Sequence, residues 1–160
     1  MPELIRGDAS RIDELEPLWL SLREHHGSVT PEWGPLHPAG ESWAVRSESY
    51  RELMADGGVM FLAVDGAAVI GCAICEEETW RSPTWQWPAN FLSIVDLIVL
   101  PAHRGEGIGV ALLTAVEDEA RSRGLDAVDI NAAAPNQEAR RFYEKHGYRL
   151  DLVTYRKPLD

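Results

Sequence analysis

The feature that most constrains this chain is a glycine-rich turn that joins an apolar stretch to a helical pattern. The apolar stretch, FLSIVDLIVLP at residues 91–101, has the length and β-branched content of a buried strand. After HRGEGIG at residues 103–109 comes GVALLTAVEDEARSRG at residues 109–124, whose apolar residues recur at helical spacing. Glycine is costly in chain entropy, so its repetition here indicates that the backbone must stay uncovered or take an unusual conformation.

A turn of this kind, placed where a strand meets a helix, presents free backbone N–H groups at the positive end of the helix dipole. A phosphate can approach such a turn closely because no side chains cover it. Gly105, Gly107 and Gly109 would open the site, and Arg104 would add a charge-assisted contact. The turn is not a P-loop, because no Gly-Lys-Ser/Thr follows, and its glycines run GxGxG rather than the GxGxxG of dinucleotide sites.

The rest of the chain alternates between strand and helix patterns. We expect strands at residues 3–8, 59–66, 67–78, 91–101, 125–131 and 148–159, and helices at residues 9–26, 41–58, 109–124 and 136–147. Ser10 is the expected N-cap of the first helix, and Asp65-Gly66 is a hairpin signal. The order β-αα-βββ-αβ-αβ predicts one α/β domain over residues 1–160, with strands of mixed direction.

Composition and charge limit the classes of partner. The 160 residues are 45% hydrophobic and 26% charged, as is typical of a globular domain. The formal net charge is −11, and residues 1–99 hold 6 Lys/Arg against 16 Asp/Glu. Non-specific binding to nucleic acid is therefore not expected; the acidity either favours a cationic small molecule or basic peptide, or only maintains solubility.

No apolar run is long enough to span a bilayer and no signal peptide is evident, so we expect a cytoplasmic protein without membrane association.

The two cysteines, Cys72 and Cys75, fall in a predicted strand with CxxC spacing. Residues three apart in a strand point to opposite faces, so we expect two reduced, partly buried thiols rather than a redox pair. Neither the cysteines nor the five histidines have the spacing of metal ligands, so no metal site is expected.

Two blocks of sequence match a known pair of motifs in the known order. RGEGIG at residues 104–109 fits Arg/Gln-x-x-Gly-x-Gly and follows LIVLP at residues 97–101, which fits L-x-V-x-P. NQEARRFYEKHGY at residues 136–148 fits N-x-x-A-x-x-F-Y-x-x-x-G-F. The chain thereby resembles the GNAT superfamily of acetyl-CoA-dependent N-acetyltransferases, over roughly residues 90–150. The resemblance implies an α/β fold with a mixed, mostly antiparallel sheet of six to seven strands, splayed at its centre, and about four helices on both faces.

The resemblance also implies acetyl-CoA as the co-substrate, with no metal. The pyrophosphate of coenzyme A would lie on the backbone of Arg104, Gly105, Glu106, Gly107, Ile108, Gly109 and Val110. The pantetheine arm would pair with a parted strand end formed by Leu97, Ile98 and Val99. The remaining positions matched near the cofactor are Asn136, Ala139 and Tyr143. Asn136 is at the same time a plausible helix N-cap, and the two roles are compatible.

The same resemblance suggests how the reaction is catalysed. Tyr143 would be the general acid that protonates the departing thiolate, although a tyrosine on an apolar helical stripe is also a common core residue. The Leu97 N–H would polarise the thioester carbonyl as an oxyanion-hole donor. Asp96 is the candidate base. An unpaired charge in an apolar strand is costly, so its presence there indicates a function, but Asp96 could instead pair with an arginine or a backbone amide. Reserve candidates for the base are Glu76, Glu77 and Glu78.

These residues predict direct transfer of an acetyl group to a primary amine of a small molecule or peptide in a ternary complex. A cationic acceptor is favoured if the tryptophans in and around two long loops, at residues 27–40 and 79–90, border its pocket; those same side chains could instead seal a core or a dimer interface. The tryptophans are Trp33, Trp43, Trp80, Trp85 and Trp87. The alternatives are a catalytically silent acetyl-CoA sensor and a different nucleotide-binding α/β enzyme. A homodimer is an open expectation, since dimers are frequent among proteins of this family.

Overall fold

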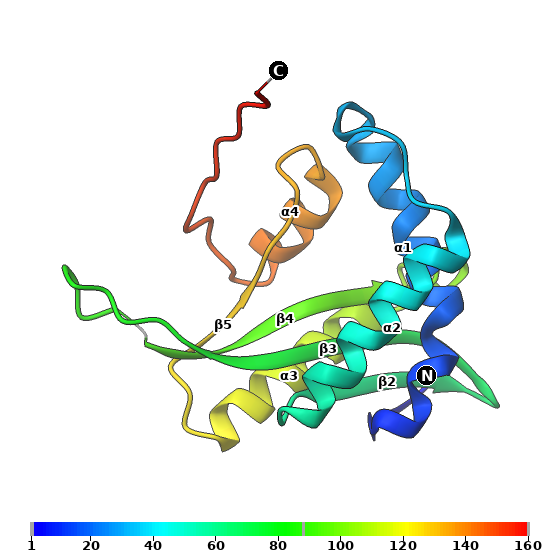
Figure 1. The fold of residues 1–160 in the computed structure, drawn as a ribbon. Helices are drawn as coiled ribbons and strands as arrows, with labels where there is room; N and C mark the ends of the chain where they lie inside the picture. The colour runs from blue at the N-terminus through cyan, green and yellow to red at the C-terminus, as the bar shows by residue number, and fades with distance from the viewer. Residues whose placement is uncertain (1, 88, 160) are drawn as a thin grey trace.

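A single five-stranded sheet forms the centre of the computed structural model, which describes residues 2–87 and 89–159 (Figure 1). The strands, in their order across the sheet, are β1 (Glu3–Gly7), β2 (Val59–Asp65), β3 (Ala68–Thr79), β4 (Asn90–Val99) and β5 (Ala127–Ile130). Neighbouring strands are antiparallel except for β4 and β5, which run parallel. The predicted mixed, mostly antiparallel sheet is confirmed.

Helices cover both faces of this sheet, as predicted. The helices are α1 (Glu16–Val29), α2 (Ala39–Ala55), α3 (Ile108–Ser122) and α4 (Gln137–Lys145), with short 3₁₀ segments η1 (Ala9–Leu15), η2 (Pro31–Trp33) and η3 (Pro101–His103). On one face η1, α1 and α2 bury Leu18 and Tyr50 against Leu62. On the other face α3 buries Leu112 against Leu92, and α4 packs onto the same core. Each face thus has its own apolar core, and β4 contributes to both.

The predicted strand at residues 148–159 is wrong, so the sheet has five strands rather than six to seven. In Figure 1 this C-terminal tail, in red, leaves the sheet beside α4. Two physical reasons account for the difference. The neighbouring edge strand, β5, is only four residues long. The alternation of apolar residues in the tail also changes face between Leu152 and Val153, so no single face can be buried against one core.

Two local predictions at the first helix also need correction. The stretch expected to be one helix begins as η1 and becomes α-helical only at Glu16, next to Pro17. Its N-cap is Asp8, whose carboxylate accepts from the Ser10 amide, rather than Ser10 itself. The Ser10 hydroxyl itself donates to the Asp8 carboxylate, so the aspartate two residues earlier takes the capping position.

The predicted β2–β3 hairpin is confirmed, and its two cysteines are more deeply buried than predicted. Gly66, with φ of 59°, lies in the turn that joins the two strands. Cys72 and Cys75 are unpaired and lie in the cores on opposite faces of β3. Both are fully rather than partly buried, and burial raises the pKa of Cys75 to about 12. These thiols are therefore unreactive packing residues.

Candidate active site

Strand β4 is paired on both sides in its first half and on one side in its second half. β5 pairs with it only from Phe91 to Ile94, opposite Ala127 to Ile130. β3 continues beside β4 as far as Val99. Within residues 2–87 and 89–159, no strand replaces β5 beyond Ile130, so the sheet parts along the second half of β4. The predicted splay lies at this point.

A β-bulge marks the place where the sheet parts. Cys75 is paired with Ile94 and the preceding Ile74 with Asp96, which leaves Val95 as an extra residue in β4. The bulge shifts the alternation of side chains by one. Ile94 therefore faces the α3 core, while Asp96 faces α1 and α2. A charged side chain is thereby directed toward the helices that cover the opposite face.

The parted half of β4 presents free backbone groups. The Leu100 amide donates to Ile70 of β3 at 2.9 Å, and N–H and C=O groups alternate between the two sides of a strand. The backbone groups of Leu97 and Val99 therefore point to the side from which β5 is missing. The Val99 carbonyl accepts from Arg104 Nε at 3.3 Å. Ile98 faces β3 with its backbone, so only part of the predicted Leu97–Val99 segment is open.

The glycine-rich turn joins β4 to α3 with its amides uncovered. Gly105 and Gly107 have φ of 80° and 84°, a conformation that favours glycine, and nothing lies within 4 Å of a side chain built on either. The Ala111 amide is the first in α3 to find a carbonyl, that of Gly107. Among the described residues, no acceptor pairs with the amides from Gly105 to Val110. The turn thus presents several N–H groups at the positive end of a helix.

The third glycine serves packing rather than openness. A side chain on Gly109 would meet the Phe142 ring at 3.2 Å. Gly109 therefore lets α4 approach the start of α3, which links the two sequence blocks in space. Of their neighbours, Ile108 is buried in the core and Val110 is exposed. The Glu106 carboxylate lies 3.6 Å from His103.

Asn136 is the N-cap of α4, as expected. Its Oδ1 accepts from the Ala139 amide at 3.2 Å and lies 3.4 Å from His25 Nε2 of α1. Asn136 is buried, and its contact with His25 ties α4 to the helix on the far side of the parted strands. The capping role is therefore established by geometry, and His25 is a neighbour that the sequence did not reveal.

Tyr143 packs beside the parted strands. Its ring lies edge-on to Phe142 and is tilted against Tyr148, with centroids 5.4 and 5.8 Å apart. In the part of the chain that the structure describes, its hydroxyl has no hydrogen-bond partner. Burial raises the pKa of Tyr143 well above its usual value, and the charge of Asp96 raises it further. The phenol therefore keeps its proton at neutral pH.

Asp96 is buried with two partners on α2. Its Oδ2 accepts from the Tyr50 hydroxyl at 2.7 Å and lies 3.6 Å from Arg46 Nε. Burial raises the pKa of Asp96, while Arg46 and the bond from Tyr50 oppose that change. The guanidinium of Arg46 also lies over the rings of Trp19 and Tyr50, at 4.4 and 5.5 Å. Both partners thus come from one helix face, and no hydrogen bond of Asp96 Oδ1 is found among the described residues.

The sequence contained a signal for these partners. Arg46 and Tyr50 are four residues apart in a predicted helix, so they share a face, and a buried carboxylate needs such a pair. Which strand that face would cover depends on tertiary packing, and only the structure supplies it.

Three carboxylates, which we call the acidic row, lie on the face of the sheet that α1 and α2 cover; they are Glu76, Glu78 and Asp129. Glu76, Ser93 and Asp129 are cross-strand neighbours on β3, β4 and β5, and Glu78 follows on the same face of β3. Burial and the charges of Asp129 and Glu76 raise the pKa of Glu78. Within the described ranges, none of these three carboxylates has an ion-pair partner. Glu77 differs, because it faces α3 and pairs with Arg123 at 3.3 Å.

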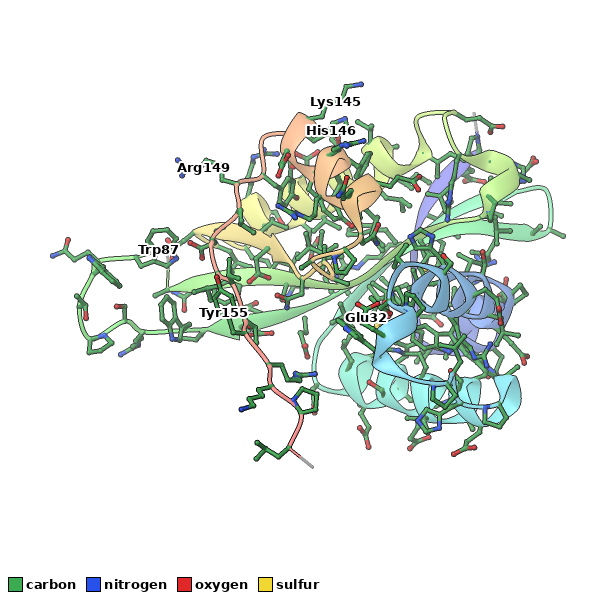
Figure 2. All side chains as sticks on the ribbon, turned by 90° about the horizontal axis from the view of Figure 1, so that it is seen from above. Glu32, Trp87, Lys145, His146, Arg149 and Tyr155 are labelled. Atoms are coloured by element: carbon green, nitrogen blue, oxygen red, sulfur yellow. The ribbon has the colours of Figure 1, made fainter. Side chains whose placement is uncertain are left out.

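The tryptophans do not gather in one place, contrary to expectation. Figure 2 shows Trp87 near the far end of the β3–β4 hairpin, away from Glu32 in the loop after α1. The same two loops are far apart in Figure 1. Trp43 lies in neither loop and packs edge-on against Tyr50. Length and composition alone cannot indicate which loops meet.

Among residues 2–87 and 89–159, no group of His, Cys, Asp and Glu side chains has an arrangement that would hold a metal ion. In the same ranges, none of the helices combines the length and the apolar character that a membrane crossing requires.

Comparison with known proteins identifies the family. The sequence profile of the acetyltransferase (GNAT) family matches residues 19–148, from α1 to the end of the second motif. The chain belongs to the GNAT family. The match includes the parted strand, the glycine-rich turn and α4, which are the elements that form the candidate site.

Curated GNAT relatives match only in part. Aminoalkylphosphonate N-acetyltransferase of Salmonella typhimurium is 36% identical over 72 residues, 44% of this chain and 47% of that protein. N-alpha-acetyltransferase 30 of Schizosaccharomyces pombe is 31% identical over 88 residues, 55% of each chain. The chain thus spans about half the length of these curated relatives.

Solved structures agree on the GNAT fold over the whole chain. A tetramutant of the BH1408 protein from Bacillus halodurans superposes with a TM-score of 0.83 at 20% identity, covering 98% of this chain and 99% of that one. Aminoglycoside acetyltransferase AAC(6')-Iy, bound to a bisubstrate analogue, gives a TM-score of 0.69 at 16% identity, with 99% of both chains covered. At such identities the likeness concerns the fold.

Proposed function

We propose that this protein transfers an acetyl group from acetyl-CoA to a primary amine by direct attack within a ternary complex. One observation carries the proposal: the parted half of β4 opens beside the uncovered amides of the glycine-rich turn. A diphosphate binds to uncovered backbone amides such as those of the turn. An extended arm that pairs like a strand needs an open strand edge such as the second half of β4. Both belong to a chain of the GNAT family.

Coenzyme A would be held mainly by backbone groups. The amides from Gly105 to Val110 would bind the pyrophosphate, aided by the charge of Arg104. The Leu97 carbonyl and the Val99 N–H would pair with the pantetheine amides, since the Val99 carbonyl already accepts from Arg104. Asn136 and Ala139, at the start of α4, would border the arm. Side chains on Gly105 or Gly107 would cover the turn, which is a second reason for glycine there.

The chemical step would use groups next to the parted strand. The neutral amine attacks the thioester carbonyl carbon, and the Leu97 N–H stabilises the oxyanion that forms. As the new C–N bond replaces the C–S bond, the Tyr143 phenol gives its proton to the departing sulfur. The proton lost by the amine passes to Asp96, through Oδ1, or to a water molecule. Proximity supplies much of the rate.

The acceptor that fits best is a cationic amine. The acidic row of Glu76, Glu78 and Asp129 has no cation of its own in the described chain and lies on the face toward which Asp96 points. Carboxylates placed side by side repel one another, and a polyamine or a lysine-rich peptide would relieve that repulsion. One curated relative is named for an aminoalkylphosphonate, whose phosphonate group carries negative charge. The rates of acetylation of a cationic amine and of an aminoalkylphosphonate therefore distinguish the two kinds of acceptor.

The test is release of free thiol from acetyl-CoA in the presence of spermidine, a lysine-rich peptide, ethanolamine or 2-aminoethylphosphonate. We expect kcat/KM to be highest for the two polycations, spermidine and the lysine-rich peptide. A double variant, Glu76→Gln with Glu78→Gln, should lower that preference at least tenfold, whereas Glu77→Gln, on the opposite face, should leave it unchanged.

Other outcomes separate the alternatives. Tight binding of acetyl-CoA with no thiol release for any amine would favour the sensor, and binding of NAD in place of coenzyme A would favour another nucleotide enzyme. A preference for 2-aminoethylphosphonate would overturn the cationic acceptor while leaving acetyl transfer intact.

A further inference from the structure

Arg46, on α2, carries a charge to which the proposed function gives no role. Its Nε lies 3.6 Å from Asp96 Oδ2, on the face of α2 that covers β4. Within residues 2–87 and 89–159, Arg46 has no second ion-pair partner. One buried carboxylate is therefore the only anion within ion-pair distance of this guanidinium.

Aromatic rings hold the side chain of Arg46 in place. Its guanidinium carbon lies 4.4 Å from the centroid of the Trp19 ring and 5.5 Å from that of Tyr50. Trp19 is itself fixed, because its indole N–H donates to Ser42 Oγ at 3.0 Å and so joins α1 to α2. A cation over an aromatic face gains a favourable electrostatic contact. The rings therefore keep Arg46 beside Asp96 and leave its charge free for that carboxylate.

The second oxygen of Asp96 is open. Oδ2 accepts from the Tyr50 hydroxyl at 2.7 Å, whereas Oδ1 has no hydrogen-bond partner among the described residues. In those residues every fully enclosed side-chain oxygen and nitrogen has a partner, so Oδ1 must reach accessible space. Burial raises the pKa of Tyr143, and the charge of Asp96 raises it further, so these two groups lie close together. The open oxygen and the proposed acid thus lie beside the same half of β4.

We propose that Arg46 is the positioning residue that keeps Asp96 ionised and its Oδ1 available to the acceptor amine. This inference rests on the proposed function, and it selects Asp96 rather than water as the group that takes the proton of the amine. As the C–N bond forms, an N–H bond of the attacking amine breaks and its proton adds to Oδ1. That proton passes to water after the products leave, which restores the carboxylate.

Burial and charge act in opposite directions on Asp96. Burial raises the pKa of Asp96, and a protonated carboxyl group cannot take a proton from an amine. The charge of Arg46 and the hydrogen bond from Tyr50 lower that pKa. Because the Tyr50 phenol is neutral, Arg46 supplies the only compensating charge of the two. Arg46 therefore decides whether a carboxylate in an apolar strand stays ionised near neutral pH.

Two further titratable groups lie near this pair, and both are neutral at pH 7. Cys72 on β3 faces Asp96, and burial together with the charge of Asp96 raises the pKa of its thiol well above the usual value. His26 on α1 faces Arg46; burial lowers the pKa of His26, and the charges of His25 and Arg46 lower it further. The ionisation of Asp96 near neutral pH should therefore depend on Arg46 alone.

The test follows the titration of Asp96 and the pH profile of acetyl transfer in the same variants. Arg46→Met removes the charge and keeps an unbranched apolar chain on Trp19, while Arg46→Lys keeps a charge. Carbon-13 NMR of the full chain labelled at its aspartate carboxyls reports on Asp96, whose signal is identified by its loss in Asp96→Asn. For Arg46→Met we expect the midpoint of this signal to rise by about one pH unit or more. The acid limb of kcat/KM for spermidine should move upward by the same amount.

Arg46→Lys should give less than half of that shift. The matched control is Arg51→Met, on the same helix, whose guanidinium pairs with Asp13 at 2.6 Å; it should move neither quantity. An unchanged midpoint in Arg46→Met would overturn the proposal. A raised midpoint with an unchanged pH profile would also overturn it, because Asp96 would then take no proton from the amine. If the wild-type protein released no thiol with any amine, the proposed function itself would fail, whatever the midpoint.

Discussion

The two halves of β4 have the same neighbour on one side and differ on the other. Both halves pair with β3, but only the first half also pairs with β5. In the first half Leu92 and Ile94 are fully enclosed, while in the second half Leu97 and Val99 are half-buried beside an open edge. The open edge is made by a missing partner rather than by special side chains. A binding surface of backbone groups can therefore arise wherever a neighbouring strand ends early.

The difference between the halves has a local cause. β5 ends at Ile130, and the chain turns away toward Asn136 and α4. At nearly the same level the bulge at Val95 shifts the alternation in β4. The two features together separate a half that is paired on both sides from a half with an open edge, and the proposed role of the second half in chemistry can be tested.

The largest effect is expected from proline in the second half. Ile98→Pro removes an N–H that faces β3 in a central strand, and we expect a loss of about 4 kcal/mol or more in unfolding free energy. Leu97→Pro removes an N–H that faces the open edge, so the protein should still fold while kcat falls roughly 100-fold with the loss of the proposed oxyanion donor. Urea unfolding and thiol release measure the two quantities.

Equal destabilisation by Leu97→Pro and Ile98→Pro would contradict the assignment of their backbone groups to different sides. Circular dichroism at low urea confirms that the Leu97 variant retains its fold before its kinetics are interpreted.

The next effect concerns the buried side chain of the second half. Asp96→Ala leaves the Tyr50 hydroxyl and the Arg46 guanidinium without their acceptor, and we expect the free energy of unfolding to fall by about 3 kcal/mol. Asp96→Asn keeps an acceptor for Tyr50 and should cost less than half as much. Urea unfolding of both variants checks the order.

Activity then separates the two roles of Asp96. If it only pairs with α2, Asp96→Asn should keep near-normal kcat once folded. If it takes the proton of the amine, kcat should fall and its dependence on pH should change. Equal stability of the Ala and Asn variants would show that the partners on α2 contribute little.

Local features of this site were predictable and tertiary ones were not. Gly107 and Asn136 have roles that follow from the chain within a few residues, a positive φ at a turn and a helix cap, and the sequence indicated both. The partners of Asp96 and the bulge at Val95 depend on which helix covers which strand. The prediction of a strand at residues 148–159 was wrong because it rested on β-like composition, whereas the apolar residues change face between Leu152 and Val153 and cannot all be buried against one core.

A smaller effect is expected from Tyr143 beside the second half. Tyr143→Phe removes the proposed proton donor for the departing sulfur and keeps the packing of the ring, so kcat should fall roughly 100-fold, about 2.7 kcal/mol. The affinity for coenzyme A should stay within about twofold, since the phenol would act after binding. Stopped-flow thiol release and calorimetric titration measure these quantities.

Tyr148→Phe is the matched control, because Tyr148 packs on Tyr143 and its hydroxyl lies 3.4 Å from Glu117, away from the parted strands. It should leave kcat unchanged. Equal losses in the two variants would assign Tyr143 to packing.

The smallest effect is a dependence of stability on pH that comes from Asp96. Because burial raises the pKa of Asp96 above 3.8, the folded protein binds this proton more tightly than the unfolded chain. The free energy of unfolding should therefore fall as pH rises from about 4 toward the raised pKa, by at most about 1.4 kcal/mol per pH unit. Asp96→Asn should remove this fall.

Glu119 is the control of opposite sign, since hydrogen bonds from Arg6 and Arg123 lower the pKa of Glu119. Its contribution is present above its ordinary pKa of 4.5 and is lost as pH falls, so Glu119→Gln should flatten the acid side of the profile instead. Urea titrations between pH 3 and 8 distinguish the two slopes, and identical profiles for Asp96→Asn and wild type would place the charge of Asp96 in water rather than in the parted half of β4.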